Sequence, residues 1–329
     1  MPRPTCFVCG SKGEIIYSDL KDRMFGVPGN WSLKRCINRD CGLCWPDPTP
    51  HEGDISLLYK AYTTHAGRGL GHGFLAYLRA AFYACYSAAN YLPSTFLGLK
   101  NARNQIFHMF LLESSPGKLL DVGCGDGGFL HRMHGLGWSA TGLDFDGKAI
   151  ENAKAMYGAK LVLMHTDLRG AGFSNETFDA VTMNHVIEHV PDAVELLKEA
   201  ERILKPGGKL VVTTPNNRSF GHKKFRDCWR GLETPRHLQI FSRSALQECA
   251  RKAGLRHAQV SSTAANADII IGGSFSFVEA KKRGDCFYGS QLKINFIRGI
   301  RSLLLQYIEA FKLRRDPDSG EELVLIYEK

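Results

Sequence analysis

Short hydrophobic runs alternate with stretches of helical period between residues 118 and 215. The runs are KLLDVG, WSATGLDFD, KLVLMHTD, FDAVTM and GKLVVTTP. Strands that are separated by helices predict βαβ units with right-handed crossovers, and therefore a parallel sheet. This part of the chain is therefore expected to form an α/β fold.

The alternation stops after Pro215. A polar and aromatic stretch runs to about residue 241, and a helix, SRSALQECARKAG, follows it with Ser242 as its N-cap and Gly254 as its stop. A strand near HAQVSST, a helical insertion at about residues 265–320 and a closing strand, ELVLIYEK, complete the chain. We therefore expect accessory helices inserted before the last strand.

One helix of that insertion, expected over residues 291–313, is basic and amphipathic. Its apolar side is formed by Phe296, Ile300, Leu304, Ile308 and Phe311. Its polar positions include Lys293, Arg301, Lys312, Arg314 and Arg315. Such a stripe predicts a helix that packs against the core, and the alternative is peripheral contact with an anionic membrane.

Residues 51–114 have a helical and aromatic pattern, and we predict a helical lid or linker there. The stretch 74–92 carries one charge, Arg79, and Pro93 stops it. It is nearly long enough to span a bilayer, but its polar residues favour a lid or a dimer face. An interfacial helix and a membrane span are the alternatives.

Five of the ten cysteines lie within the first 44 residues. Cys6-x2-Cys9 and Cys36-x4-Cys41 form the two-pair pattern of a tetrahedral zinc site. Cys44 leaves a second choice open, because Cys41-x2-Cys44 is also an acceptable spacing. The proline-rich run WPDPTP ends this segment, so residues 1–50 are predicted to be a zinc-ribbon. Reduced core cysteines without a metal are the alternative.

The composition changes this picture little. Hydrophobic residues make up 44% of the 329 positions, which suits a globular protein. The 42 Lys and Arg against 33 Asp and Glu give a net charge of +9, which permits a nucleic-acid, acidic-substrate or anionic-membrane partner and proves none. No apolar run follows the first basic residue, so we expect no secretory signal. We therefore expect a cytoplasmic location.

The stretch LLDVGCGDGGFL, residues 119–130, meets the pattern G-x-G-x-x-G at Gly123, Gly125 and Gly128. In a dinucleotide site this loop approaches two phosphates, which Asp121 would repel. S-adenosylmethionine has no phosphate and carries a sulfonium and an ammonium group. A carboxylate beside the glycine turn therefore favours S-adenosylmethionine as the cofactor.

Two further carboxylates are placed for the same cofactor. Asp144 closes the second strand, about 20 residues downstream, where it can accept both ribose hydroxyls. Asp167 follows the third strand, where it can accept a hydrogen bond from the adenine amino group. The other candidate cofactor contacts are Cys124, Phe145, Leu168, Asn184 and His185.

LLDVGCGDGGFL, TGLDFD, HTDL, FDAVTMNHVIEHVPD and ILKPGGKLVVTTPN follow one another as in class I S-adenosylmethionine-dependent methyltransferases, especially the group of the ubiquinone-biosynthesis O-methyltransferases. The resemblance covers about residues 115–263. It implies a Rossmann-like, seven-stranded sheet whose last strand is antiparallel, within a methyltransferase domain over residues 115–329.

The segment LKRCINRDCGLCWPDPTP resembles the second knuckle of zinc-ribbon-bearing methyltransferases. That resemblance implies Cys6, Cys9, Cys36 and Cys41 as the ligands and puts Cys44 at an apolar position. Four thiolates leave no open position for water, so the zinc is expected to be structural.

The loops after the fourth and fifth strands are expected to face the transferred methyl group. They supply Asn184, His185, Glu188, His189, Asn216, Asn217, Trp229, Arg236 and His237. Histidine is the natural base near neutral pH, so His237 is the first candidate and His189 the second. Both histidines have a purely structural alternative, and Arg236 either steers an acidic substrate or is a solvated charge.

These features predict an enzyme that methylates a hydroxyl or a carbon of a small or lipid-linked metabolite, such as a saccharide, a sugar nucleotide or a quinone-like compound. The alternatives are a zinc-ribbon RNA methyltransferase and a non-catalytic binding module. The basic residues are spread along the chain and no RNA-binding signature is present, which favours the metabolite. Peripheral contact with the inner face of the membrane is compatible with this function, and the oligomeric state is open.

Overall fold

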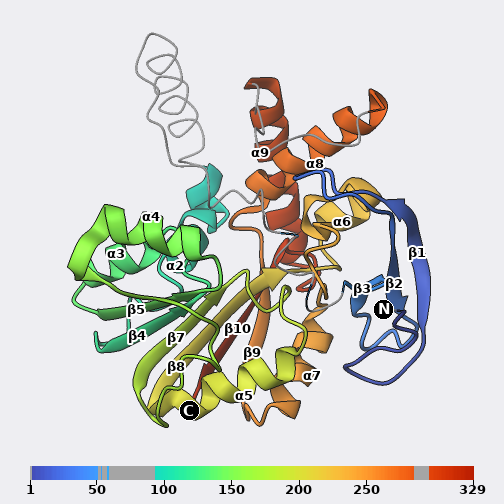
Figure 1. The fold of residues 1–329 in the computed structure, drawn as a ribbon. Helices are drawn as coiled ribbons and strands as arrows, with labels where there is room; N and C mark the ends of the chain where they lie inside the picture. Colours follow the sequence, from blue (N-terminus) through green and yellow to red (C-terminus); the bar gives the residue numbers. More distant parts are fainter. Residues whose placement is uncertain (1, 51–52, 54–57, 59–92, 285–295) are drawn as a thin grey trace.

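The computed structural model describes residues 2–50, 53, 58, 93–284 and 296–329. Its centre is a seven-stranded sheet with the strand order β6-β5-β4-β7-β8-β10-β9 (Figure 1). The strands are β4 (Lys118–Val122), β5 (Ser139–Asp144), β6 (Val162–His165), β7 (Phe178–Asn184), β8 (Leu204–Pro215), β9 (Gln259–Thr263) and β10 (Glu322–Glu328).

The first five strands are parallel, and β10 runs antiparallel to both β8 and β9. The α/β prediction is confirmed, as is the seven-stranded sheet with an antiparallel last strand. The chain order reverses at β4, because β5 lies on one side of it and β7 on the other. The carboxyl ends of β4 and its neighbours therefore form the edge where an open α/β sheet binds ligands.

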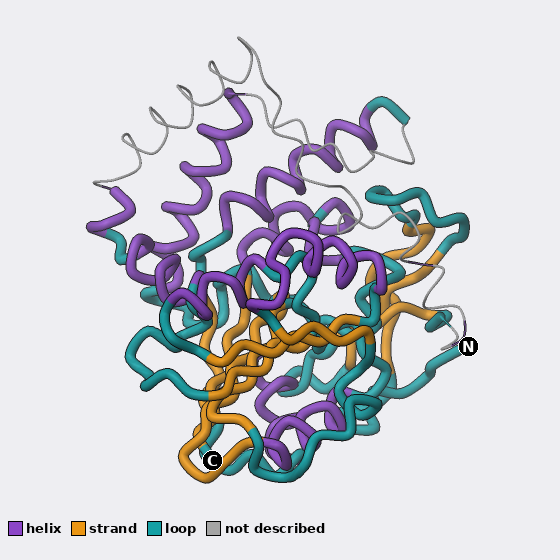
Figure 2. The backbone as a smooth tube through the Cα atoms, turned by 60° about the vertical axis from the view of Figure 1, so that its left-hand side comes forward, coloured by secondary structure: helices purple, strands orange, loops and turns teal. Residues whose placement is uncertain are grey.

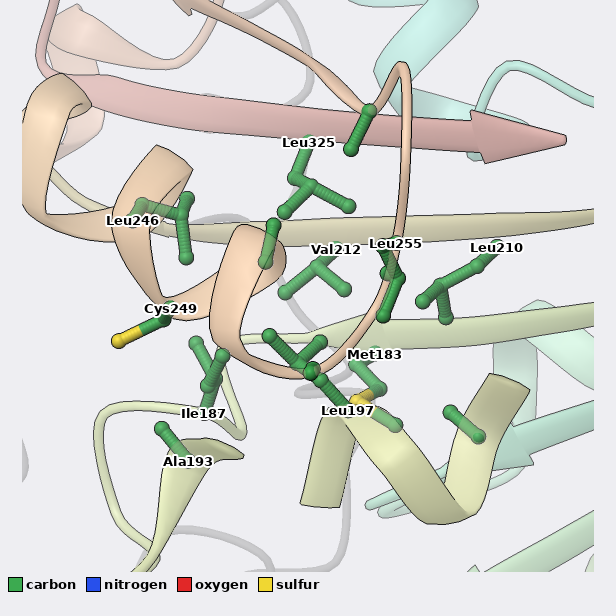
Figure 3. Packing of buried hydrophobic residues seen from close by; sticks show 14 of the residues in the cluster. Met183, Ile187, Ala193, Leu197, Leu210, Val212, Leu246, Cys249, Leu255 and Leu325 are labelled. Carbon is green, nitrogen blue, oxygen red and sulfur yellow. The ribbon is translucent and has the colours of Figure 1, made fainter. Parts of the chain in front are cut away.

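Helices cover both faces of the sheet (Figure 2). Alternate residues of one strand face opposite sides, so Val211 packs with α3 (Gly128–Gly135) and α4 (Gly147–Tyr157), whereas Val212 packs with α5 (Ala193–Ile203) and α7 (Arg243–Lys252). Figure 3 shows part of the second cluster. Ser242 caps α7 by accepting a hydrogen bond from Ala245 N–H at 3.0 Å, as its sequence predicts.

The remaining helices lie at the carboxyl-end side of the sheet or beyond it: α2 (Leu99–Phe107), α6 (Phe220–Phe225), α8 (Ala267–Lys282) and α9 (Phe296–Leu313) (Figure 1). In the chain, the helices α8 and α9 lie between β9 and β10. They pack on each other. The stripe of α9 does not face the core, since Ile300, Leu304, Ile308 and Phe311 are exposed. The prediction of a core-facing stripe is therefore wrong.

No helix among the described residues is both long enough and apolar enough to cross a membrane. The stretch 74–92, predicted to be a lid or a dimer face with an interfacial helix and a membrane span as alternatives, lies outside the described residues.

The N-terminal segment forms its own antiparallel sheet of β1 (Gly13–Leu20), β2 (Trp31–Cys36) and β3 (Cys44–Asp47). It is joined to the rest of the chain at Cys44 and Ile240, which exchange two backbone hydrogen bonds of 2.8 and 3.0 Å. Buried Leu43 and Trp45 belong to the same hydrophobic cluster as α5 and α7. The cysteine-rich segment therefore shares one core with the large sheet.

Candidate functional site

The glycine loop connects β4 to α3 at the point where the strand order reverses. Gly123 has a φ of +73°, and a Cβ on it would lie 2.5 Å from Cγ2 of Val186. Gly125 also has a positive φ, of +52°. Only glycine meets both demands at position 123, so the loop leaves bare backbone beside the cavity.

Asp121, the last-but-one residue of β4, is buried beside this loop and lines the cavity. Thr182 Oγ1 donates a hydrogen bond of 2.7 Å to Asp121 Oδ1. Burial raises the pKa of Asp121 to about 7, although the Thr182 hydrogen bond opposes that shift. A cationic ligand would restore the charged form, so the residue fits the ammonium end of S-adenosylmethionine.

Asp144 holds the glycine loop against the end of β5. Its Oδ2 accepts a hydrogen bond of 2.8 Å from Gly125 N–H, and its Oδ1 accepts one of 2.8 Å from Asp146 N–H. Each carboxylate oxygen has a second lone pair, so these bonds leave room for two hydroxyl donors. The predicted ribose contact is therefore compatible with the geometry.

One group of the cofactor candidates lines a cavity of about 1520 Å³, and a second group does not. Its lining includes Asp121, Gly123, Cys124, Gly125, Asn184 and His185. Asp144, Phe145, Asp167 and Leu168 are not part of that lining. Asp167 Oδ1 accepts a hydrogen bond of 2.6 Å from Gly170 N–H and closes its own turn, and Leu168 is buried in the core. Phe145 is half exposed beside this edge of the sheet.

His185 lies between two carboxylates at the end of β7. Its Nδ1 is 3.0 Å from Glu188 Oε1, and its Nε2 is 2.7 Å from Glu322 Oε1. Burial alone would lower the pKa of His185, but the two hydrogen bonds outweigh it and raise the pKa to about 10. The ring is therefore an imidazolium at neutral pH and cannot act as a base.

His189 and His237 meet edge to face on the cavity wall, with ring centroids 4.7 Å apart. Each Nδ1–H donates to a backbone carbonyl: His189 to Arg236 O at 3.1 Å and His237 to Gly231 O at 2.9 Å. Burial lowers the pKa of His237 to about 4, so that ring is neutral. Because Nδ1 of the neutral His237 ring carries the proton, its Nε2 holds the basic lone pair.

Glu188, His189 and His237 bring one ligand atom each within 4.8 Å of one another, which is also a spacing for a metal ion. Both oxygens of Glu188 are already hydrogen-bonded, Oε1 to His185 and Oε2 to the Thr214 hydroxyl at 2.9 Å. The carboxylate thus anchors the charged His185. The two histidines are better described as base candidates with a buried anion behind them.

Arg236 does not reach the cavity. Its guanidinium pairs with Asp22 at 2.7 Å and with Glu233 at 3.1 Å, and its side chain is fully buried. Neither interpretation of Arg236, a substrate-steering cation or a solvated charge, is therefore correct. It joins the segment that carries His237 to the cysteine-rich sheet.

Three other residues expected near the methyl group also support the fold instead. The side-chain amide of Asn216 donates to Asp318 O and Gly320 O, and that of Asn217 donates to Gly42 O and Ile240 O. The indole of Trp229 donates to Glu321 Oε2 at 2.7 Å. These buried contacts order the segment that covers the cavity.

Several cavity residues were absent from the sequence predictions. Glu322 opens β10, Glu233 and Arg230 flank a turn before His237, and α2 contributes Arg103 and Phe107. No local pattern marks these positions: Glu322, Arg103 and Phe107 reach the site from elements distant in the chain, and Arg230 and Glu233 lie in an irregular segment. Only the position of Glu322 at the start of a strand next to β8 could have suggested it.

Cys6, Cys9, Cys36 and Cys41 form a cluster in which all four sulfurs lie within 4.8 Å of one another. Cys6 and Cys41 Sγ are 3.7 Å apart, and Cys9 and Cys36 Sγ are 3.3 Å apart. Tetrahedral zinc with Zn–S bonds of about 2.3 Å requires sulfurs about 3.8 Å apart. The four thiols therefore fit a structural zinc.

Cys44 is not part of this cluster. It is fully buried, and its thiol lies 3.8 Å from Gly42 O. Burial raises the pKa of Cys44 to about 11. The choice of Cys36 over Cys44 thus agrees with the geometry.

Residues 99–260 match a family model described as a methyltransferase domain. A curated ubiquinone biosynthesis O-methyltransferase of Vibrio parahaemolyticus is 33% identical over 32% of this chain and 49% of its own length. A demethylmenaquinone methyltransferase of Bacillus cytotoxicus is 35% identical over 41% of this chain and 61% of its own length. The chain spans about half the length of the curated relatives it matches.

Among solved structures, a phosphoethanolamine N-methyltransferase 2 of Haemonchus contortus aligns with a TM-score of 0.46 and 19% identity, over 70% of this chain and 52% of that one. The strand order and the family match are the two findings that classify the chain. Residues 99–260 therefore form a methyltransferase domain on a sheet with the strand order expected for the class I S-adenosylmethionine-dependent enzymes, and a cysteine cluster of the zinc-ribbon kind precedes this domain.

Proposed function

We propose that this protein transfers a methyl group from S-adenosylmethionine to a hydroxyl or a carbon of a small or lipid-linked metabolite. The observation that carries the proposal is that one cavity is lined both by the buried Asp121 beside the glycine loop and by His189 and His237. The cofactor candidates and the candidate bases thus line the same cavity. When bound, S-adenosylmethionine supplies an electrophilic methyl group.

The residues of the chain divide the remaining work. Asp121 would bind the cationic end of the cofactor, and Asp144 the ribose. Cys124, Phe145, Asp167, Leu168, Asn184 and His185 are proposed to complete the cofactor site. Adenine recognition by Asp167 uses the carboxylate oxygen that does not close the turn with Gly170.

His237 Nε2 would accept the proton of an acceptor hydroxyl, and His189 is the second choice. His237 Nε2 lies 3.9 Å from Glu233 Oε2, and the carboxylate would stabilise the imidazolium as it forms. Its low pKa keeps the base neutral before the proton arrives. If the acceptor is a carbon, the same pair would remove the proton of an enol.

Support for the acceptor class comes from the relatives, two of which are named for ubiquinone and demethylmenaquinone methylation. A quinone-like or otherwise lipid-linked acceptor also suits a protein that works at the cytoplasmic face of the membrane without spanning it. We propose that location. RNA methylation and a non-catalytic binding module are the competing functions.

Calorimetric titration with S-adenosylmethionine and with its demethylated product tests the proposal. We expect binding by the native chain and at least about tenfold weaker binding by Asp121→Ala, whereas exposed Asp40 on the zinc-ribbon provides a control, Asp40→Ala. Near pH 7 the binding should release protons from Asp121, seen as a dependence of the enthalpy on the buffer. Absence of binding to both compounds would end the proposal and favour the binding module.

A further inference from the structure

The helix α9 exposes a row of apolar side chains on its outer face. Five large apolar side chains, between 40% and 62% exposed, lie on its outer face at spacings of three or four residues. We call this the α9 outer face; it consists of Ile297, Ile300, Leu304, Ile308 and Phe311. At 1.5 Å per residue the stripe is about 21 Å long.

The inner face of the same helix buries polar side chains beside apolar ones such as Leu303 and Ala310. Arg298 Nη1 donates to Ser276 Oγ at 2.7 Å, Gln306 Nε2 donates to Ala264 O at 2.8 Å, and Glu309 Oε1 accepts from Glu321 N–H at 2.7 Å. A water-facing helix has the opposite arrangement, because exposed apolar area is unfavourable in water. The α9 outer face is therefore built for an apolar environment.

A groove continues this face toward α6. It has a volume of about 600 Å³, and its apolar walls include Leu97, Phe220, Ile308 and Phe311. Cationic side chains lie over two of these rings: Lys312 Nζ is 4.6 Å from the Phe220 centroid, and Arg315 Cζ is 5.1 Å from that of Phe311. The groove combines apolar walls with three cations, Lys223, Lys312 and Arg315, and one carboxylate, Asp316, which pairs with Lys223 at 3.5 Å.

The charges along α9 have one sign wherever they are exposed. Glu309 is the only acidic residue between 296 and 315, and it is buried. The exposed charges are those of Arg301, Lys312, Arg314 and Arg315. A protein partner of ordinary composition does not require four exposed cations beside an apolar stripe. An anionic bilayer provides an apolar acyl-chain region and negative headgroups together.

The groove beside the outer face also neighbours the cavity of the proposed active site. Leu97 lines the groove, while Thr95 and Gly98 line the large cavity, and Phe96 between them is 81% exposed. Neighbouring residues of one short segment thus line the groove and the large cavity. An acceptor with an apolar tail could reach the cavity from a surface on which α9 rests.

We propose that the α9 outer face and its groove dock on an anionic phospholipid bilayer, with α9 lying in the plane of the interface. The proposal rests on the membrane location in the proposed function, and it does not depend on methyl transfer. Ile300, Leu304, Ile308 and Phe311 enter the boundary of the acyl chains, and Arg301, Lys312, Arg314 and Arg315 contact phosphates.

Co-sedimentation of the full chain with two kinds of vesicle tests the docking. We expect binding to vesicles of phosphatidylcholine mixed with phosphatidylglycerol, and at least about tenfold weaker binding to phosphatidylcholine alone. Leu304→Glu with Ile308→Glu should weaken the first by about tenfold or more. Ile15→Glu, the same change at an exposed isoleucine of β1, is the matched control and should change nothing.

Equal binding of native protein and the double variant, or no preference for anionic vesicles, would overturn the proposal. Sedimentation velocity adds a second measurement. A native dimer that the double variant converts to a monomer, without vesicle binding by either, would identify the face as a contact between copies and also overturn it. S-adenosylmethionine titration of the same variants should be unchanged, so a failure of docking is separate from a failure of the proposed function.

Discussion

The Arg236 guanidinium and the Asp22 carboxylate form a buried, doubly hydrogen-bonded ion pair, with Nη1 2.7 Å from Oδ2 and Nη2 2.9 Å from Oδ1. Asp22 also accepts backbone N–H bonds from Met24 and Val27. The pair connects the loop after β1 with the segment that presents His237. The zinc-ribbon is thereby tied to the wall of the proposed active site.

Asp22→Ala should destabilise the protein by about 3–5 kcal/mol, because it leaves the Arg236 charge buried with one partner fewer. Denaturant unfolding of the full chain measures this loss. Asp40→Ala removes an exposed carboxylate from the same segment and should cost less than about 0.5 kcal/mol. An equally small loss in both variants would show that the ion pair contributes nothing that a neutral pair would not.

Local patterns predicted the parts of the molecule that local physics decides. The apolar runs became strands, Ser242 became an N-cap, and the spacing of Cys6, Cys9, Cys36 and Cys41 placed four sulfurs together. The position of Asp121 beside a glycine turn was predicted from a short motif in the same way. Each of these features is set by neighbours within a few residues or by a short motif.

Contacts across the chain were not predictable from such patterns. Asp22 and Arg236 are separated by 214 positions, and Glu322 reaches His185 over 137. In α9, periodicity identified the apolar stripe correctly but could not tell which side faces the protein. The inner side was decided by buried partners, such as Ser276 for Arg298, which lie on another helix.

Zinc content separates the two cysteine assignments. Cys36→Ser should lose most of the metal, about one zinc per native chain, since a hydroxyl is a poor replacement for a thiolate. Cys44→Ser keeps the cluster intact and should retain the metal. Atomic absorption of the purified variants measures both. Full metal in Cys36→Ser together with loss in Cys44→Ser would reverse the assignment, and a native chain without zinc would refute the site.

The charged His185 should make stability depend on pH. Its folded pKa is raised to about 10 from about 6.5 in the unfolded chain, so its contribution is fully present below about pH 6.5 and is lost as the pH rises through about 10. The same pair lowers the pKa of Glu188 to about 2, because the hydrogen bond to His185 outweighs burial. On the acid side the contribution therefore fades below about pH 4.5.

The difference in unfolding free energy between the native chain and His185→Asn isolates this effect from other titrating groups. That difference should be largest near pH 6 and should shrink toward pH 10. His134→Asn, at an exposed position of α3, should leave the curve unchanged. A difference that stays constant across this range would mean that His185 is neutral in the folded protein.

Variants of His237 distinguish a catalytic role of this residue from a structural role in the pocket. The ring lines the cavity, its Nδ1–H donates to Gly231 O, and its Nε2 lies 3.9 Å from Glu233 Oε2, so the ring has one structural bond and one basic nitrogen. His237→Ala should lower kcat by about 10²-fold or more and leave S-adenosylmethionine affinity nearly unchanged. His237→Asn can keep the bond to Gly231 O through its side-chain amide but offers no basic nitrogen, so it should be equally slow.

Turnover to the demethylated product, with an acceptor that the native protein accepts, is the measurement. Normal turnover in His237→Asn with a defect in His237→Ala would make the residue a support of the pocket. A larger defect in His189→Ala than in either would transfer the role of base to His189.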